Sequence, residues 1–349
     1  MDDTPFVREI GKQPAALRNL AEYYSGKEGA VLLSVITSEI SSKQKIIFTG
    51  MGTSLYAPYI IKKELAGLSQ SVEIMDAGEF LHFGLRGIKG NEILLAISQS
   101  GESVETRKVV GELKGKVKVV SIVNDTSSFM GKNSDYVLPL HAGEEASIST
   151  KTYTNTLAVL LLLSACLNRR DPDIDIKHFH KTASAMEDTL EEINNKAVKA
   201  VNFFGELSTL HFVARGSDIV TARQWALIIK EGAGIFSESL SAGLFRHGPI
   251  ELAGKGHSVI FIISKDNMPE LNLNLAEEIK KLGSRVLIVS DNRKYGNLPV
   301  MNVNIESPSS RCFPLMCAPF IELFVHEAAK HKGRKAGIFR HVTKITSKE

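Results

Sequence analysis

The sequence has few cysteines and almost no net charge. Its three cysteines, Cys166, Cys312 and Cys317, include no Cys-x-x-Cys pair. An odd, sparse set excludes a disulfide framework and a structural zinc site, and it predicts three reduced thiols. The 42 Lys and Arg residues against 39 Asp and Glu leave a formal charge of +3. That excess is too small for the basic footprint of a nucleic-acid-binding protein.

The sequence also lacks the signals of a membrane or secreted protein. Its longest apolar stretch, Leu157–Cys166, is shorter than the roughly 20 residues needed to cross a bilayer, so we expect a buried helix there. The chain begins Met1-Asp2-Asp3, without the basic and apolar regions of a signal peptide. Neither nucleic acid nor a membrane is therefore expected as a partner, and the predicted location is cytoplasmic.

Apolar strands alternate with helical stretches, which is typical of parallel sheets joined by right-handed crossovers. A helical segment is expected in residues 1–40, followed by domains at 41–205 and 206–349. Each domain is predicted to be α/β, with a flavodoxin-like five-stranded parallel sheet flanked by helices. The ranges that carry this prediction are strands at Lys45–Phe48, Val72–Met75, Glu92–Ile97, Lys118–Val123, Tyr136–Leu140, His211–Ala214, Ser258–Ile263, Arg285–Val289 and Met301–Ile305, and helical stretches at about 54–68, at 152–205 with an interruption near Asp171-Pro172, and at 319–332.

The two halves of the chain resemble each other. Phe48–Thr53 matches Phe212–Ser217, and each run is expected to end a first strand and open a first helix. Each helix then reaches a Lys-Glu pair, Lys63-Glu64 and Lys230-Glu231. A match over so long a period indicates a duplicated domain rather than a solenoid repeat. Two unrelated α/β domains are the alternative.

Polar runs follow the expected strands at the edge where parallel α/β sheets bind ligands. Gly50–Ser54 allows close backbone approach and presents a helix N-terminus with two hydroxyl groups. Ser98–Ser103 places three hydroxyls, an amide and a glycine ahead of a helix, as a phosphate site requires. The alternative is a helix N-cap at Ser100 with Ser103 as part of a capping box, which would account for fewer of these polar residues. The Gly-Lys-Ser/Thr of a Walker loop is absent, which disfavours ATP hydrolysis.

Three further runs carry hydroxyl or titratable side chains. Ala146–Lys151 opens the long apolar helix and again offers hydroxyls at its start. Lys230-Glu231 ends a helix ahead of Gly232-Ala233-Gly234, whose small residues leave room for a ligand. His247 precedes Gly248-Pro249 and is expected in a turn. Taken alone, a glutamate is most often solvated and a histidine most often structural.

Together these runs resemble the sugar isomerase (SIS) family. More closely, they look like the isomerase half of glutamine–fructose-6-phosphate aminotransferase, the SIS-type glucosamine-6-phosphate deaminases and the fructosamine-6-phosphate deglycases. The resemblance runs from about Gln44 to the tail and implies two tandem SIS domains. It rests on five motifs in order: Gly50–Ser54, Ser98–Ser103, Gly143–Lys151, Lys230-Glu231 and His247–Pro249.

The resemblance implies an enzyme that isomerises or deaminates a 6-phosphosugar, in particular an amino-sugar phosphate such as glucosamine 6-phosphate. It implies that Glu231 moves a proton between C1 and C2 and that His247 assists ring opening, both reasonable chemistry for these groups. It implies a homodimer with shared active sites, and no metal or other cofactor. The residues implied in binding the phosphate or the sugar are Thr53, Ser54, Ser98, Gln99, Ser100, Ser103, Ser147 and Ser149.

Three departures from the family pattern leave alternatives open. The sequence has no glutaminase domain with a cysteine nucleophile, so the chain is not expected to take ammonia from glutamine. The family has a lysine three residues before the catalytic glutamate, and this sequence has Ile228 there. At the position of the C-terminal family lysine it has Arg340, which cannot form a Schiff base. Glu231 and His247 favour an isomerase or deaminase, with a fructosamine-6-phosphate-type deglycase as one alternative. The two lost lysines favour the other alternative, a phosphosugar-binding regulator without catalysis.

Overall fold

The computed structural model describes residues 4–297, 300–341 and 343–344. The chain divides into two compact units, unit A (Ala15–His180 with Phe339–Glu349) and unit B (Met1–Pro14 with Lys181–Ile338). The first 14 residues belong to unit B because helix α1 (Pro5–Gly11) packs on helix α14 (Phe313–His331). The boundary between the units falls within helix α10, which is continuous from Pro172 to Phe204.

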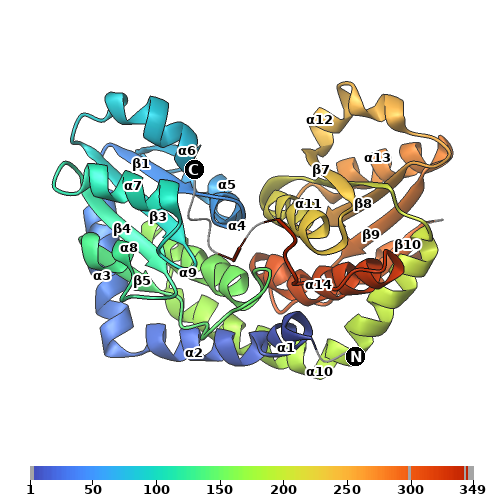
Figure 1. Cartoon of the computed structure of the whole chain (residues 1–349), viewed down its shortest axis with the longest axis horizontal. Helices are drawn as coiled ribbons and strands as arrows, with labels where there is room; N and C mark the ends of the chain where they lie inside the picture. The colour runs from blue at the N-terminus through green and yellow to red at the C-terminus, as the bar shows by residue number, and fades with distance from the viewer. Residues whose placement is uncertain (1–3, 298–299, 342, 345–349) are drawn as a thin grey trace. The chain divides into compact units, whose positions relative to one another are not determined.

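Unit A is a five-stranded parallel sheet flanked by helices, as predicted (Figure 1). Its strand order, β2-β1-β3-β4-β5, is that of a flavodoxin-like fold. The strands are β1 (Lys45–Gly50), β2 (Ser71–Asp76), β3 (Glu92–Ser98), β4 (Lys118–Val123) and β5 (Tyr136–Pro139). The helices are α2 (Gln13–Ser25), α3 (Lys27–Ser41), α4 (Thr53–Tyr56), η1 (Ala57–Ile60), α5 (Lys62–Leu65), α6 (Ala77–Glu79), η2 (Phe80–Gly84), η3 (Leu85–Gly87), α7 (Val104–Leu113), α8 (Phe129–Asn133), α9 (Lys151–Leu167) and the start of α10.

Buried strands and helices form the core of unit A. Strand β3 is buried along its whole length, as expected for a central parallel strand covered on both faces. On one face, Leu94 and Ala96 of β3 pack in one cluster with Val109 and Val110 of α7. Helix α9 is buried almost throughout, which confirms the buried helix expected at Leu157–Cys166. This packing holds the carboxyl ends of the central strands, and the loops that follow them, at one edge of the sheet.

The single helix expected over about 54–68 is wrong. Three short segments replace it: α4, the 3-10 helix η1 and α5. Pro58 lies in the first turn of η1, where its ring removes a backbone donor and restricts the preceding residue. The apolar residues keep a helical spacing across the three segments, and for this reason the sequence pattern predicts a single helix.

Unit B is a second five-stranded parallel sheet, with the order β10-β9-β8-β6-β7. Numbered from β6, these strands follow the same order as those of unit A. The strands are β6 (Thr209–Ala214), β7 (Phe236–Ser241), β8 (Ser258–Ile263), β9 (Arg285–Ser290) and β10 (Met301–Asn304). The other elements are α1, the rest of α10, η4 (Gly216–Asp218), α11 (Ile219–Ala233), α12 (Ala242–Arg246), η5 (Pro249–Leu252), α13 (Pro269–Lys281), η6 (Arg293–Asn297), η7 (Ser310–Cys312) and α14.

Two elements of unit B depart from the sequence pattern. Strand β7 is not predicted, because it reads Phe-Ser-Glu-Ser-Leu-Ser and lies, only partly buried, at the edge of the sheet. Helix α14 begins at Phe313 rather than at Pro319, which lies inside it. Pro314 occupies the first turn instead, the position that proline favours. Among the described residues, Ser310–His331 is the one stretch long and apolar enough to cross a membrane, and nearly all of it is buried in the core.

Candidate functional site

The first two polar runs meet at the carboxyl ends of β1 and β3 in unit A. Strand β1 ends at Gly50, and α4 begins at Thr53 after Gly52 in a positive-φ conformation (φ +53°). A Cβ at Gly50 would lie 2.9 Å from the carbonyl oxygen of Ile97 and 2.9 Å from the Cβ of Ser54. Only glycine permits this approach, which places Ser54 beside the end of β3.

Hydrogen bonds among its own hydroxyl groups shape the Ser98–Ser103 loop. The Ser98 hydroxyl accepts a hydrogen bond from the Gly101 amide (3.2 Å) and shares another with the Ser103 hydroxyl (3.2 Å). Ser98 is only 2% exposed, so its hydroxyl supports the loop from inside. The residues of the loop that are half-buried are Gln99, Ser100, Glu102 and Ser103.

The alternative of a helix cap by Ser100 is wrong. The N-cap residue of α7 is Ser103, and among the described residues its side chain makes no capping hydrogen bond. The Ser100 hydroxyl instead accepts from the Glu102 amide at 3.1 Å. The first amide groups of α7 carry the partial positive charge of a helix N-terminus. The loop therefore combines neutral hydroxyl groups with a helix start that lacks a side-chain cap, and helix N-termini of this kind suit an anion.

Helix α8 anchors the serine loop from behind. The Gly101 carbonyl oxygen accepts from the Met130 amide at 3.2 Å, and the Glu102 carboxylate accepts from the Phe129 amide at 2.6 Å. Gly101 has φ +68°, and a Cβ there would lie 2.0 Å from the hydroxyl oxygen of Ser128. The glycine is therefore required twice, by its backbone conformation and by the space it leaves.

Asn124, directly after β4, links the serine loop to the third polar run. Its backbone amide donates to the Gln99 carbonyl oxygen at 3.1 Å. Its side-chain amide donates to the Gly143 carbonyl oxygen (2.8 Å), and its side-chain oxygen accepts from the Ala142 amide (2.9 Å). The sequence reasoning missed this residue, although an amide side chain at the carboxyl end of a central strand is a usable signal.

The loop before α9 is built around the buried carboxylate of Glu145. This carboxylate accepts from the amides of Thr150 (2.9 Å) and Thr152 (3.1 Å) and from both threonine hydroxyls. Lys344 forms an ion pair with it at 2.8 Å and also donates to the Ser147 carbonyl oxygen. Burial acts to raise the pKa of Glu145, but the Lys344 ammonium and these hydrogen bonds outweigh burial, so the pKa is lowered. The carboxylate is therefore ionised at neutral pH.

The structure separates the two serines predicted in this loop. Ser147 is buried, whereas Ser149 is half-buried and accessible. Neither Glu145 nor Lys344 is predicted as a site residue from the sequence. They are 199 positions apart, and no local pattern links residues at that separation.

The two predicted catalytic residues lie in unit B. Glu231 is exposed on the last turn of α11, which ends at Ala233 and is capped by Gly234 with φ +66°. A Cβ at Gly234 would collide with the Arg334 guanidinium, so glycine leaves room for that cation at the helix end. His247 is exposed at the end of α12, ahead of Gly248 with φ +119°, which confirms the expected turn.

The corresponding edge of unit B carries a buried carboxyl group in place of a serine loop. In the alignment of the two halves, Asp218 stands where unit A has Ser54. Asp218 is fully buried after β6 and accepts from the Ser264 amide after β8 at 2.8 Å. Burial raises the pKa of Asp218 to about 7. An acidic group at this place disfavours an anion.

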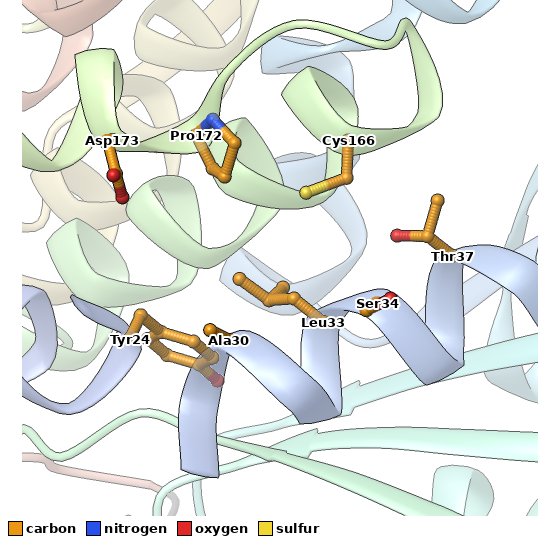
Figure 2. Close-up of a pocket in the computed structure, with 8 residues that line it drawn as sticks. All are labelled: Tyr24, Ala30, Leu33, Ser34, Thr37, Cys166, Pro172 and Asp173. Carbon is orange, nitrogen blue, oxygen red and sulfur yellow. The ribbon is translucent and has the colours of Figure 1, made fainter. Parts of the chain in front are cut away.

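A pocket of about 290 Å³ lies in unit A among helices α2, α3, α9 and α10 (Figure 2). Burial raises the pKa of Cys166 on its wall, so this cysteine is a thiol rather than a reactive thiolate. None of the three cysteines forms a disulfide, as predicted. The pocket is lined by residues outside the predicted site: Tyr24, Ala30, Leu33, Ser34, Thr37, Cys166, Pro172 and Asp173.

Comparisons with known proteins agree with these motifs. A family model described as the SIS domain matches residues 39–165 and 207–295. The chain is 30% identical over 346 residues to the glutamine–fructose-6-phosphate aminotransferase (isomerizing) of Sulfurisphaera tokodaii, an alignment that covers 98% of this chain and 56% of that protein. The chain thus spans about half the length of the curated relatives it matches.

Solved structures show the same fold. The C-terminal domain of glucosamine-fructose-6-phosphate aminotransferase from Francisella tularensis superposes with a TM-score of 0.83 at 20% identity, covering 96% of this chain and 98% of that one. Glucosamine-6-phosphate deaminase from Thermotoga maritima superposes with a TM-score of 0.76 at 19% identity, covering 98% and 99%.

Proposed function

The chain belongs to the SIS domain family, and we propose that it is an enzyme that isomerises or deaminates a 6-phosphosugar. The proposed substrate is an amino-sugar phosphate, in the interconversion of glucosamine 6-phosphate and fructose 6-phosphate. The observation that carries this proposal is the Ser98–Ser103 loop, which joins hydroxyl donors to an uncapped helix N-terminus at the ligand edge of a parallel sheet. The names of the relatives point to the same class of substrate.

The phosphate is proposed to bind in unit A. Gln99, Ser100 and Ser103 are half-buried rather than buried, and we propose that their polar groups contact the phosphate. Thr53 and Ser54 add hydroxyl donors from the end of β1. The buried hydroxyl of Ser98 supports the loop by holding the Gly101 amide, and Ser149 is the accessible residue for contact with the sugar.

Proton transfer is assigned to unit B. Glu231 is proposed as the base that moves a proton between C1 and C2, because this shift needs one carboxylate near both carbons. His247 is proposed to assist ring opening, since an imidazole exchanges protons near neutral pH. Both side chains are exposed and lie where a helix ends beside a glycine.

We further propose a cytoplasmic homodimer in which His247 serves the active site of the neighbouring subunit. Two large apolar side chains flank His247 on α12 and η5, Leu244 (61% exposed) and Leu252 (59% exposed). Exposed apolar groups beside a functional residue fit a surface that a second copy covers. Light scattering that shows only monomer at micromolar concentration would contradict the dimer.

One observation favours the regulator as a second candidate. Ile228, at the position of a family lysine, is 1% exposed and belongs to the core of α11, so no ammonium group is available there. A protein that keeps the serine loop without the lysines can bind a phosphosugar and leave it unchanged.

The deglycase alternative retains both Glu231 and His247 and differs only in the amine adduct that it cleaves.

A direct assay separates these functions. Purified protein is incubated with glucosamine 6-phosphate, and ammonia and fructose 6-phosphate are measured. The reverse reaction and fructosamine 6-phosphate are tested in parallel. The proposal expects turnover of glucosamine 6-phosphate. Binding of these phosphosugars without turnover of any would favour the regulator, and turnover confined to fructosamine 6-phosphate would favour the deglycase.

A further inference from the structure

Lys344 holds the loop that carries Ser147 and Ser149. Its Nζ lies 2.8 Å from a carboxylate oxygen of Glu145 and also donates to the Ser147 carbonyl oxygen. The Glu145 side chain is 0% exposed, whereas the Lys344 side chain is 20% exposed. A fully buried carboxylate is thus neutralised by an ammonium group that enters from the surface on the C-terminal segment.

The loop depends on the charge of Glu145. An ionised carboxylate buried without an opposite charge is strongly destabilising. Helix α9 compensates in part, because the amides of Thr150 and Thr152 at its start donate to Glu145. Lys344 adds the full positive charge that these neutral donors lack.

The other lysine of the loop has a different partner. Lys151 is buried, and its ammonium donates to the Glu144 carbonyl oxygen at 2.6 Å. Within the described part of the chain, Lys344 is therefore the lysine hydrogen-bonded to Glu145. Its second hydrogen bond, to Ser147, ties the middle of the loop to the same ammonium.

We propose that Lys344 is a positioning residue that fixes the Ala146–Thr150 loop and so presents Ser149 to the sugar. It acts through Glu145 and the Ser147 carbonyl group rather than on the substrate. The ordering of the loop stands on the contacts alone, while the presentation of Ser149 rests on the proposed function. Sugar binding in unit A thereby becomes dependent on the C-terminal segment from Phe339 onward, which carries Lys344.

The first test measures the loop without any ligand. Lys344→Met keeps the length of the side chain and removes its charge, and hydrogen–deuterium exchange is followed by mass spectrometry on peptides that span Thr150 and Thr152. We expect exchange there to accelerate roughly 10- to 100-fold, the range for loss of a charge-assisted hydrogen bond. The matched control is Lys116→Met, which removes an exposed ion pair with Glu112 in the same unit and should leave these peptides unchanged.

The second test separates positioning from general damage. Calorimetry with inorganic phosphate probes the serine loop, and its affinity should stay within about twofold in Lys344→Met because Lys344 is hydrogen-bonded to Glu145 and Ser147 of the other loop. Affinity for fructose 6-phosphate should fall by roughly tenfold. In the Glu145→Gln background, Lys344→Met should accelerate exchange less than it does in the wild-type chain, since only the hydrogen bond to the Ser147 carbonyl oxygen is then lost.

Each outcome decides one part of the proposal. Unchanged exchange at Thr150 and Thr152 in Lys344→Met would overturn the ordering role. Faster exchange with unchanged fructose 6-phosphate affinity would overturn the presentation of Ser149. Wild-type protein that binds inorganic phosphate but neither fructose 6-phosphate nor glucosamine 6-phosphate would contradict the proposed function and the sugar contact together, while the exchange result still decides the ordering role.

Discussion

Replacing Gly101 by alanine should destabilise unit A and abolish phosphate binding. Gly101 has φ +68°, a conformation that costs a non-glycine residue about 1–2 kcal/mol. Its new Cβ would also lie 2.0 Å from the hydroxyl oxygen and 2.6 Å from the Cβ of Ser128, so Ser128 must move. The serine loop would then lose its fit against α8.

Ser128 is not free to move, because it caps α8. Its hydroxyl donates to the Asp125 carbonyl oxygen (2.6 Å) and accepts from the Gly131 amide (3.2 Å). Loss of such a cap costs about 1 kcal/mol, which brings the total for Gly101→Ala to about 2–4 kcal/mol with the backbone cost and the residual clash. Ser128→Gly should partly rescue the variant, because glycine removes the clash and is nearly as good an N-cap.

Gly115 offers the matched control. It has φ +77° in the same unit, and a Cβ there would meet no described atom within 4 Å. Gly115→Ala therefore isolates the backbone cost of about 1–2 kcal/mol. Urea unfolding followed by circular dichroism gives the stabilities, and calorimetry gives the affinity for inorganic phosphate. Equal destabilisation by the two substitutions, or wild-type phosphate affinity in Gly101→Ala, would refute this reasoning.

Three further substitutions test other parts of the site. Ser100→Ala should weaken inorganic phosphate binding by roughly 10- to 100-fold in calorimetry and leave the fold intact; unchanged binding would reduce the loop to a turn. Asp218 has a pKa raised from 3.8 to about 7, so the stability it contributes is present below pH 4 and lost as pH rises through 7. At pH 8 the free energy of unfolding of Asp218→Asn, measured with urea, should therefore exceed that of the wild type by up to about 4 kcal/mol. At pH 4 the substitution should give no such increase. His247→Asn should lower turnover in a coupled assay, but less for a substrate already in the open-chain form; an equal loss for both would argue against a role in ring opening.

Much of the fold could be predicted because its signals are local. Buried parallel strands are short apolar runs that stop at polar turns, a pattern seen in β1, β3, β4, β6, β8 and β9. The strand that was not predicted, β7, lies at an edge where burial imposes no continuous apolar run. The helix start at Phe313 was obscured by Pro319, which is as compatible with a first turn as with this buried helix.

The candidate site likewise has a part that local sequence predicts and a part that depends on contacts between distant residues. The serine loop is a contiguous run, so its residue types and its place after β3 follow from the sequence. The contacts of Asn124 and the pairing of Glu145 with Lys344 depend on chain folding across 18 to 199 positions. Ser98 and Ser147 carry the right hydroxyl groups but are buried, which only the packing reveals.

Deuterium incorporation at C1 or C2 of a sugar phosphate in heavy water, followed by NMR, tests the central claim most directly. This measurement detects proton abstraction even when the net reaction is unknown. Wild-type protein should exchange a carbon-bound hydrogen of fructose 6-phosphate or glucosamine 6-phosphate. Glu231→Gln, which keeps the size and hydrogen bonding of the side chain but not its basicity, should slow exchange by about 10²–10⁴-fold with little change in affinity. Wild-type protein that binds these sugars yet exchanges no carbon-bound hydrogen would contradict the enzyme, and full exchange in Glu231→Gln would contradict the assignment of the base.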